Sequence, residues 1–223
     1  MSFVLEARGI GKRFAGVVAL DDVSIGVRPG SVHAVVGENG AGKSTLMKIL
    51  SGVYQPDAGE LLRDGRPASF PSPRAAEAAG VAIIHQELNL CPNLSVTDNL
   101  FMGREIVRRN GTVDARTERR LATEVLARLE EPIDPDTDVA DLRLGQQQVV
   151  EIARAISLQA RVLIMDEPTS ALSSAEVDVL FRVIRELTAS GVAIVYISHH
   201  LEEALHHLAS QVRASSAARR TET

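Results

Sequence analysis

Residues 32–50 read VHAVVGENGAGKSTLMKIL, and this stretch decides the fold. Its first five residues are apolar enough for a buried strand, and the glycine-rich segment that follows ends this strand before a predicted helix over 43–50. Gly52 stands where the C-terminal cap of that helix belongs. Residues 37–44 fit the pattern G-x4-G-K-[ST] in the strand-loop-helix context that a phosphate-binding loop requires. A glycine-rich turn with an incidental lysine is the alternative, and the flanking strand and helix disfavour it.

The residue types in this loop suit a nucleotide. Glycines let backbone N–H groups turn inward around phosphate oxygens, and the helix N-terminus presents the positive end of its dipole to the same anion. We expect Lys43 to reach the β- and γ-phosphates and the Ser44 hydroxyl to ligate Mg²⁺, so ATP and Mg²⁺ are the predicted cofactors. The predicted nucleotide-binding residues of the loop are Gly37, Glu38, Asn39, Gly40, Ala41, Gly42, Lys43, Ser44 and Thr45.

A second apolar strand, over 162–165, ends in two adjacent carboxylates, Asp166 and Glu167. A parallel strand would deliver Asp166 to the carboxyl edge of the sheet beside the loop, where it can hold Mg²⁺ directly or through water. Glu167 then sits one residue further on and is the candidate general base that polarises the attacking water. A lone Asp-Glu pair after a strand is more often a solvated turn, but the upstream phosphate loop favours the catalytic interpretation.

The rest of the chain alternates short β-branched runs with helical stretches, a pattern typical of a parallel sheet flanked by helices. Further predicted elements are a hairpin turning at Asp64-Gly65, a helix from Ser72-Pro73 to Gly80, strands over 81–84 and 192–197, and a helix with a Ser173–Glu176 capping box that Gly191 ends. The predicted fold class is α/β: a P-loop NTPase core with an antiparallel β hairpin region and an inserted α-helical subdomain.

Domain boundaries follow from changes in pattern. From about 95 to 157 the sequence shows helical periodicity with many charges, which predicts the helical subdomain. The ATPase domain is expected over 1–208, with its core at about 1–94 and 158–208. Residues 209–223 are mostly small and polar, and they cannot bury enough apolar surface to offset their ordering entropy, so a disordered tail is expected.

Composition excludes several classes of function. The net charge of −5 argues against a nucleic-acid binder, whose phosphate partner would require a basic face. The single cysteine, Cys91, rules out an internal disulfide and fits a reducing compartment. No secretory leader is expected at the N-terminus, and the longest apolar runs are too short to span a bilayer. We therefore expect a soluble chain whose membrane role would come through a partner.

The order of the remaining motifs resembles that of ABC-transporter ATPases over residues 3–208. The resemblance implies that Gln86 approaches Mg²⁺ and the attacking water and that His199 senses the γ-phosphate. Phe14 stands where the family stacks an aromatic ring on adenine. Residues 142–148, LRLGQQQ, match the signature segment, so Arg143, Gly145 and Gln146 would contact the γ-phosphate that the opposite subunit binds. Residues 170–173 match the segment called the D-loop.

Within this family, residues 9–23, 85–90 and 146–153 resemble the first nucleotide-binding domain of simple-sugar importers of the ribose, xylose and galactose type. The resemblance implies a Mg²⁺-dependent ATPase that lies in the cytoplasm on the inner face of the cell membrane and powers a permease. Its implied partners are the transmembrane permease, a second nucleotide-binding domain in a homo- or heterodimer and, indirectly, a periplasmic or extracellular sugar-binding protein. No nucleic-acid partner is implied, and the resemblance does not choose the sugar.

Two departures from the pattern keep an alternative open. The signature segment normally has a serine where this chain has Arg143, and the branch usually fuses two domains and continues into another strand where a polar tail begins at Ser210. A truncated or degenerate domain that binds ATP with little turnover is therefore the alternative function. A non-transport ABC ATPase would be expected to show long insertions or basic faces, and neither is evident. The arginine run over 104–109 is read as a solvated helical face, and the histidines over 199–207 are disfavoured as a metal site.

Overall fold

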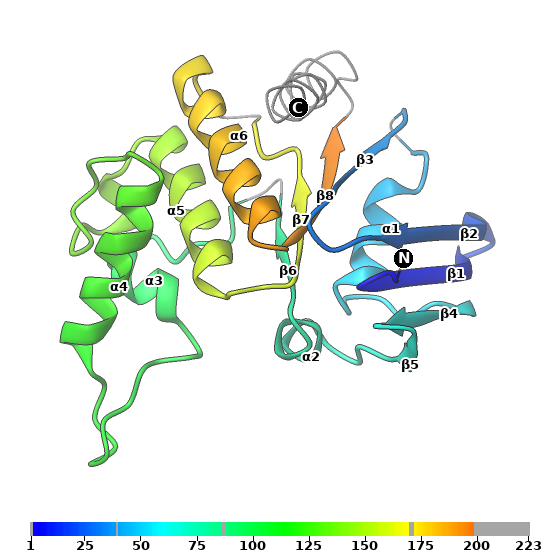
Figure 1. Cartoon of the computed structure of the whole chain (residues 1–223), viewed down its shortest axis with the longest axis horizontal. Helices are drawn as coiled ribbons and strands as arrows, with labels where there is room; N and C mark the ends of the chain where they lie inside the picture. The colour runs from blue at the N-terminus through cyan, green and yellow to red at the C-terminus, as the bar shows by residue number, and fades with distance from the viewer. Residues whose placement is uncertain (1, 39, 86–87, 170–171, 199–223) are drawn as a thin grey trace, which may run out of the picture.

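The chain forms two β-sheets, with helices on both faces of one of them (Figure 1). The computed structural model describes residues 2–38, 40–85, 88–169 and 172–198. The strands are β1 (Leu5–Phe14), β2 (Val17–Val27), β3 (Val32–Val36), β4 (Ala58–Arg63), β5 (Arg66–Ala68), β6 (Val81–Ile84), β7 (Val162–Asp166) and β8 (Ala193–Ser198). The helices are α1 (Lys43–Leu50), α2 (Pro73–Ala78), α3 (Val96–Phe101), α4 (Ala115–Arg128), the 3₁₀ turn η1 (Val139–Asp141), α5 (Leu144–Ser157) and α6 (Ser174–Ala189). The α/β class with an antiparallel region and a helical segment is confirmed.

The parallel sheet has the strand order β3-β8-β7-β6 and separates two apolar cores. Alternate side chains of β7 enter opposite cores: Leu163 and Met165 pack with the helices α3 to α6, whereas Val162 and Ile164 pack with α1 and the antiparallel sheet. Burial on both faces explains why β7 and β8 are continuous apolar runs. The prediction of a fully buried β3 was wrong, because β3 lies at an edge of the sheet and Val36 is 39% exposed.

The antiparallel sheet has the order β2-β1-β4-β5 and contains strands that sequence patterns did not assign. β1 and β2 pair through a tight turn at Ala15-Gly16, where both residues have positive φ, 42° and 88°. The predicted hairpin at Asp64-Gly65 is confirmed as the β4–β5 turn. Arg161, at the start of β7, binds the Asp64 carboxylate through two hydrogen bonds of 2.7 and 2.9 Å. This bidentate pair connects the two sheets.

The predicted helix boundaries are confirmed by their caps. Ser72 caps α2 by accepting the Ala75 N–H at 3.2 Å, and Pro73 follows as the first helical residue. Ser173 and Glu176 form the reciprocal capping box of α6, with the Ser173 N–H donating to the Glu176 carboxylate at 2.6 Å. Gly52, with φ of 76°, ends α1. These local signals are short-range, which is why the sequence alone located them.

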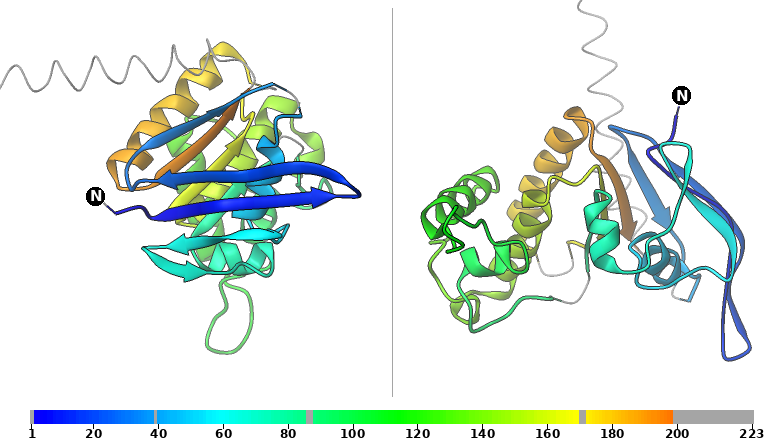
Figure 2. Two further views of the ribbon diagram at one scale, coloured as in Figure 1. Left: turned by 90° about the vertical axis from the view of Figure 1, so that its right-hand side faces the viewer. Right: turned by 90° about the horizontal axis from the view of Figure 1, so that it is seen from below.

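The helices α3, α4 and α5 lie on the side of the parallel sheet opposite the antiparallel sheet (Figure 1, Figure 2). They fall within the predicted subdomain 95–157, whose boundaries stay a prediction, and the predicted tail lies outside the described residues. The arginine run over 104–109 is not helical but connects α3 to α4. Arg104 is half-buried and donates to the Leu100 and Ser157 carbonyls, the latter at 3.1 Å, so the solvated-face interpretation was wrong for this residue. In the described part, no helix is both long and apolar enough to cross a bilayer.

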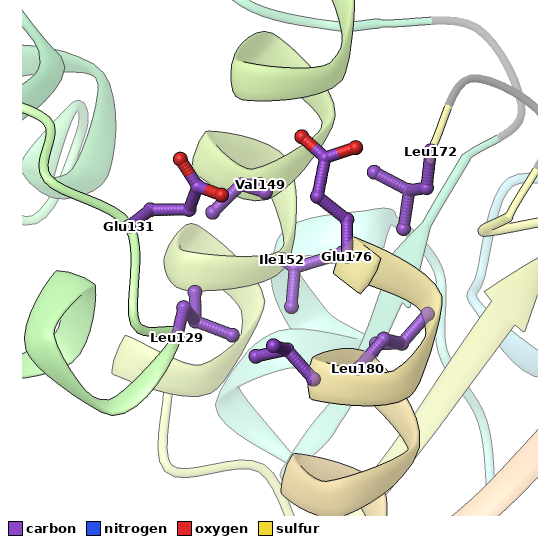
Figure 3. Close-up of a pocket in the computed structure, with 8 residues that line it drawn as sticks. Leu129, Glu131, Val149, Ile152, Leu172, Glu176 and Leu180 are labelled. Carbon is purple, nitrogen blue, oxygen red and sulfur yellow. The ribbon is translucent and has the colours of Figure 1, made fainter. Parts of the chain in front are cut away.

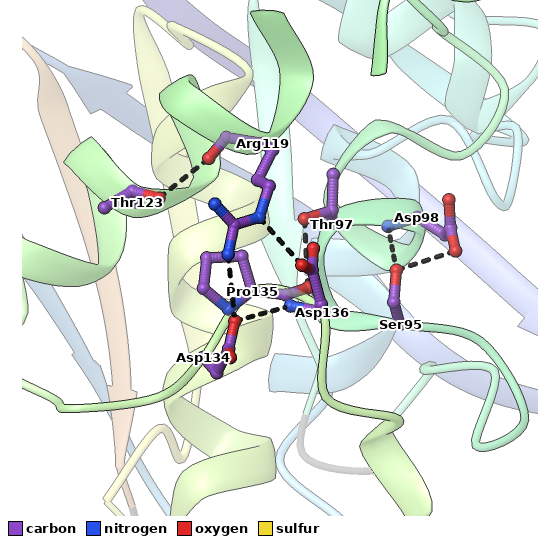
Figure 4. Close-up of polar contacts among 8 residues, drawn as sticks. All are labelled: Ser95, Thr97, Asp98, Arg119, Thr123, Asp134, Pro135 and Asp136. Carbon is purple, nitrogen blue, oxygen red and sulfur yellow. Dashed lines mark hydrogen bonds and ion pairs between the residues drawn. The ribbon is translucent and has the colours of Figure 1, made fainter. Parts of the chain in front are cut away.

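The loop that leads into α5 is held against α3 and α4 (Figure 4). Arg119 on α4 binds Asp136 at 2.8 Å and Asp134 at 3.5 Å. The Thr97 backbone N–H and hydroxyl on α3 both donate to the Pro135 carbonyl, at 2.9 and 3.0 Å. These contacts fix the approach of the chain to the start of α5, which carries the predicted signature segment.

Candidate functional site

The loop between β3 and α1 and the end of β7 face a common cavity of about 270 Å³. The residues that line it are Val17, Val18, Ala19, Gly40, Ala41, Gly42, Lys43, Ser44, Thr45, Asp166 and Glu167. The cavity lies at the carboxyl ends of parallel strands, the edge at which open α/β sheets bind ligands. The structure therefore brings the predicted phosphate loop and the predicted acid pair together.

Gly42 sets the position of the loop against β2. It has φ of +83° directly before α1, and a Cβ on it would lie 2.6 Å from the Ala19 carbonyl oxygen and 2.8 Å from a Leu20 methyl group. Only glycine fits so close to another backbone segment in this conformation. No side chain caps α1 at Gly42, so the N–H groups of its first turn and the positive end of its dipole are available to an anion.

The Lys43 ammonium folds back over the loop. It donates to the Gly37 carbonyl at 2.5 Å and to the Glu38 carbonyl at 2.9 Å. These contacts hold the positive charge beside Ser44 and Thr45, which also line the cavity. Gly37 and Glu38 therefore act through their carbonyls on Lys43 rather than as lining residues.

The two carboxylates are placed by an unusual turn at the end of β7. Glu167 has φ of +48°, a left-handed conformation that is uncommon for a side chain of its size, and its N–H donates to the Ile197 carbonyl at 3.0 Å. Burial raises the pKa of Asp166, the neighbouring Glu167 raises this pKa further, and the Lys43 charge opposes both effects. A divalent cation beside Asp166 would relieve the repulsion between the two carboxylates, so the donor set fits Mg²⁺.

One wall of the cavity was missed by sequence reasoning. Val17, Val18 and Ala19 open β2 and line the cavity beside the loop, with Val17 67% and Val18 48% exposed. Two consecutive valines in a strand point to opposite faces, so at least one of them was bound to lie outside the core of a one-sided sheet. That exposed apolar position was the available signal.

The remaining residues predicted to contact adenine, Mg²⁺ or the γ-phosphate do not line the described cavity or lie outside the described residues. Phe14 ends β1, packs against Tyr54 with ring centroids 5.2 Å apart, and does not line the cavity. Lys12 places its ammonium 5.5 Å from the Phe14 ring centroid. Asn39, Gln86 and His199 lie outside the described residues.

The predicted signature residues Arg143, Gly145 and Gln146 stand at the start of α5 and do not line the phosphate cavity. The Arg143 N–H donates to the Gln146 side-chain oxygen at 3.2 Å. A guanidinium has no acceptor with which to return this bond, so only half of a capping box is formed. Neighbouring Leu144 is among the exposed large apolar side chains.

A second, very small cavity of about 10 Å³ lies between α5 and α6 (Figure 3). Its lining is apolar except for the carboxylates of Glu131 and Glu176, which point to the same side in the figure. Burial raises the pKa of Glu131, and the nearby Glu176 charge raises it further. The volume suits nothing larger than a water molecule, and the described residues contain no group of three or more His, Cys, Asp or Glu side chains that could hold a metal ion.

Comparisons with known proteins agree with this geometry. The model of the family described as "ABC transporter" matches residues 20–170. The "Ribose import ATP-binding protein RbsA 1" of Rubrobacter xylanophilus is 56% identical over 200 residues, which are 90% of this chain and 40% of that protein. The "Ribose import ATP-binding protein RbsA 2" of Burkholderia pseudomallei is 55% identical over 213 residues, 94% of this chain and 41% of that protein. The chain thus spans about two fifths of the length of these relatives.

Solved structures with a similar fold are ATP-binding cassettes of ABC transporters. A nucleotide-free ATP-binding cassette from an ABC transporter superposes with a TM-score of 0.79 and 26% identity, covering 93% of this chain and 85% of that chain. The ADP conformation of another ABC-transporter cassette gives a TM-score of 0.77 and 27% identity at the same coverage. With a family model over more than half of its length and a matching fold, this chain belongs to the ABC transporter family.

Proposed function

We propose that this chain is a nucleotide-binding unit that binds and hydrolyses ATP with Mg²⁺ to power a membrane importer. One observation carries the proposal: a single cavity is lined by Lys43, Ser44, Asp166 and Glu167. A phosphate-binding lysine, a hydroxyl ligand and two carboxylates are the groups that phosphoryl transfer to water needs. No other described cavity combines them.

Each group has a proposed role. The loop from Gly37 to Thr45, including Asn39, surrounds the phosphates, and Lys43 neutralises their charge. Ser44 and Asp166 hold Mg²⁺, which would neutralise charge on the β- and γ-phosphates when bound. Glu167 orients the attacking water and accepts its proton as general base. Val17, the more exposed of the two valines, supplies an apolar contact for the base, and we keep Phe14 as the aromatic partner of adenine.

A second unit completes the site in this proposal. The start of α5, with Arg143, Gly145 and Gln146, would face the γ-phosphate held by the opposite unit, and Gln86 and His199 would contact Mg²⁺, water and phosphate. ATP shifts the pair toward closure only by the contacts that it makes in the closed state. Hydrolysis removes those contacts and reopens the pair.

The importer role rests on the relatives, which are named as ribose import ATP-binding proteins. We infer that this chain corresponds to one nucleotide-binding unit of such a protein and that its cargo is a simple sugar. It would act on the cytoplasmic face of the membrane with a permease, and indirectly with a sugar-binding protein. A groove of about 180 Å³, lined by residues that include His85, Asn89, Glu151 and Arg154, offers a surface for a permease loop.

A second candidate function is favoured by one observation. Arg143 replaces the small hydroxyl donor that a close contact with phosphate would use by a long guanidinium, and it leaves the capping box of α5 half-formed. A unit that binds ATP but turns it over poorly would follow from this substitution.

Mg²⁺-dependent ATP hydrolysis by the purified chain, compared with its Glu167→Gln variant, tests the proposal. We expect ATP binding in both proteins, turnover that rises more than linearly with protein concentration in the wild type, and none in the variant. Binding without turnover in both proteins would instead support the second candidate. Absence of ATP binding in both would refute the proposed function.

A further inference from the structure

The backbone of Asn89 is held on both sides by helix α5. The Asn89 N–H donates to Glu151 Oε1 at 2.6 Å, and the Asn89 carbonyl accepts from an Arg154 guanidinium N–H at 3.2 Å. Glu151 and Arg154 are three residues apart, so they share one face of the helix. Both polar groups of one peptide segment are therefore satisfied by one short stretch of α5. We call this arrangement the Asn89 clamp.

Burial distinguishes the clamp from an ordinary surface contact. Glu151 is 5% exposed, whereas carboxylates are seldom fully buried without a partner. Its short hydrogen bond is charge-assisted, and bonds of this kind are about twice as strong as neutral ones. The charged and titratable groups around it are Arg154 on α5, Glu77 on α2 and His85 after β6, all of which line the same groove.

The clamp lies on the same helix as the predicted signature residues. α5 is one uninterrupted helix of 14 residues, and its N-cap is Arg143. Glu151 lies about 12 Å further along the axis, taking a rise of 1.5 Å per residue. The same rigid element therefore starts at the proposed phosphate-contacting end and grips the chain just beyond β6.

The segment on the other side of Asn89 is also anchored. The Cys91 N–H donates to Asn99 Oδ1 at 2.7 Å, and the Asn99 amide donates to the Cys91 carbonyl at 3.0 Å. Asn99 belongs to α3, which packs on α5. The stretch from Asn89 to Cys91 is thus attached to the helices α3 and α5 by hydrogen bonds.

We propose that Glu151 and Arg154 are positioning residues, which make the segment after β6 move with the helix that begins at Arg143 when ATP binds. A displacement of the start of α5 is then transmitted along the helix to Asn89 and to the groove beside it. The inference rests on the proposed function, because the motion is driven by nucleotide.

Hydrogen exchange of the full chain, read by mass spectrometry on peptides covering 88–95, tests the clamp. Glu151→Leu removes the acceptor and should raise exchange at the Asn89 amide by about 10-fold or more, the effect of losing a charge-assisted hydrogen bond. Glu151→Gln keeps an acceptor oxygen and should stay within about 3-fold of wild type. Glu77→Gln neutralises another carboxylate of the same groove, one that belongs to α2 and not to α5, and it should change nothing.

The coupling is tested by adding ATP and Mg²⁺ under non-hydrolysing conditions, in the Glu167→Gln background. We expect nucleotide to change exchange over 88–95 in that background and in the Glu151→Gln double variant. In the Glu151→Leu double variant the response over 88–95 should be lost while ATP affinity stays within about 3-fold. Arg154→Met should act like Glu151→Leu, and Arg154→Lys, which keeps a donor, should restore the response.

Two results would overturn the inference. If Glu151→Leu raises exchange equally throughout α5, the residue supports the helix and does not position the segment. If its response to nucleotide matches that of Glu151→Gln, the clamp carries no coupling. A chain that fails to bind ATP refutes the proposed function, whereas the nucleotide-free exchange still reports whether the clamp exists.

Discussion

The phosphate loop and the start of α5 are both helix N-termini, yet they are built in opposite ways. At α1 the loop packs closely against β2 at Gly42, and the Lys43 ammonium donates hydrogen bonds to two backbone carbonyls. At α5 the residues Arg143 and Leu144 are exposed, and Arg143 supplies only half of a capping box. The contrast supports the proposal that the phosphate loop is complete within one chain, whereas the start of α5 contacts phosphate only together with a second unit. Four substitutions can break or sharpen this comparison.

The largest effect is expected at Gly42. In Gly42→Ala the new Cβ would meet the Ala19 carbonyl oxygen at 2.6 Å, so the loop or β2 must shift, and ATP affinity should fall at least about 100-fold. The matched control is Gly65→Ala, because Gly65 has a similar φ of +75°, has nothing within 4 Å of its Cβ position and does not line the cavity. It should lose only the cost of the left-handed conformation, about 1–2 kcal/mol of stability. Titration with a fluorescent ATP analogue measures the difference, and equal losses would contradict the role of close approach.

Asp166→Asn should separate stability from function at the same site. The pKa of Asp166 is raised by burial, so the folded protein binds this proton more tightly than the unfolded chain, and the ionised form costs stability as pH rises through the range above 3.8. The variant should therefore unfold at a higher temperature than wild type at pH 7, with a gain that shrinks toward pH 4. Mg²⁺-dependent ATP binding should be lost.

Asp64→Asn is a control that should change the unfolding temperature in the opposite direction. The hydrogen bonds from Arg161 lower the pKa of Asp64, so its contribution to stability is present at neutral pH and is lost as pH falls through the lowered pKa. This variant should unfold at a lower temperature than wild type at pH 7. Thermal unfolding from pH 4 to 7 compares both, and a destabilised Asp166→Asn protein would disprove the account of that site.

Arg143→Ser should convert the start of α5 into a full cap. A serine hydroxyl can accept the Gln146 N–H, which would stabilise the protein by about 1 kcal/mol. Turnover should also rise if the small hydroxyl restores contact with phosphate. Arg143→Ala removes the guanidinium without adding an acceptor, so an equal gain in denaturant unfolding for both variants would refute the capping argument.

The smallest effect is expected further along α5. Gln148 is 1% exposed, and its Nε2 has no hydrogen-bond partner within the described structure. Gln148→Met keeps the shape and removes a desolvated donor, so stability should be unchanged or higher by about 1 kcal/mol. The neighbouring Gln147 donates to the Val139 and Leu142 carbonyls at 3.2 and 3.0 Å, and Gln147→Met should lose about 1 kcal/mol. A destabilised Gln148→Met would indicate a partner for that amide.

Sequence patterns located those parts of the molecule that local rules determine. The loop from Gly37 to Ser44 is contiguous, and the caps at Ser72 and Ser173 act within one turn, so residue types at fixed spacing identify them. The carboxylates at the end of β7 also followed, because the carboxyl ends of parallel strands share one edge.

Contacts between distant segments could not be predicted in this way. The apolar wall of Val17 and Val18 depends on how closely Gly42 approaches β2, which no local pattern encodes. The Asn89 clamp joins residues more than sixty positions apart. The burial of β3 was misjudged because an apolar run does not reveal whether its strand lies inside a sheet or at its edge.

The strand order β3-β8-β7-β6 also has a consequence for how the protein is made. In the described chain β3 pairs only with β8, and about 150 described residues lie between these two strands. At the usual pace of synthesis, β3 and the loop behind it would wait on the order of 10 to 30 s for their partner strand to leave the ribosome. The phosphate loop is therefore synthesised early, but the strand that precedes it pairs late. We expect the pocket of a nascent chain to form only after β8 has entered the sheet.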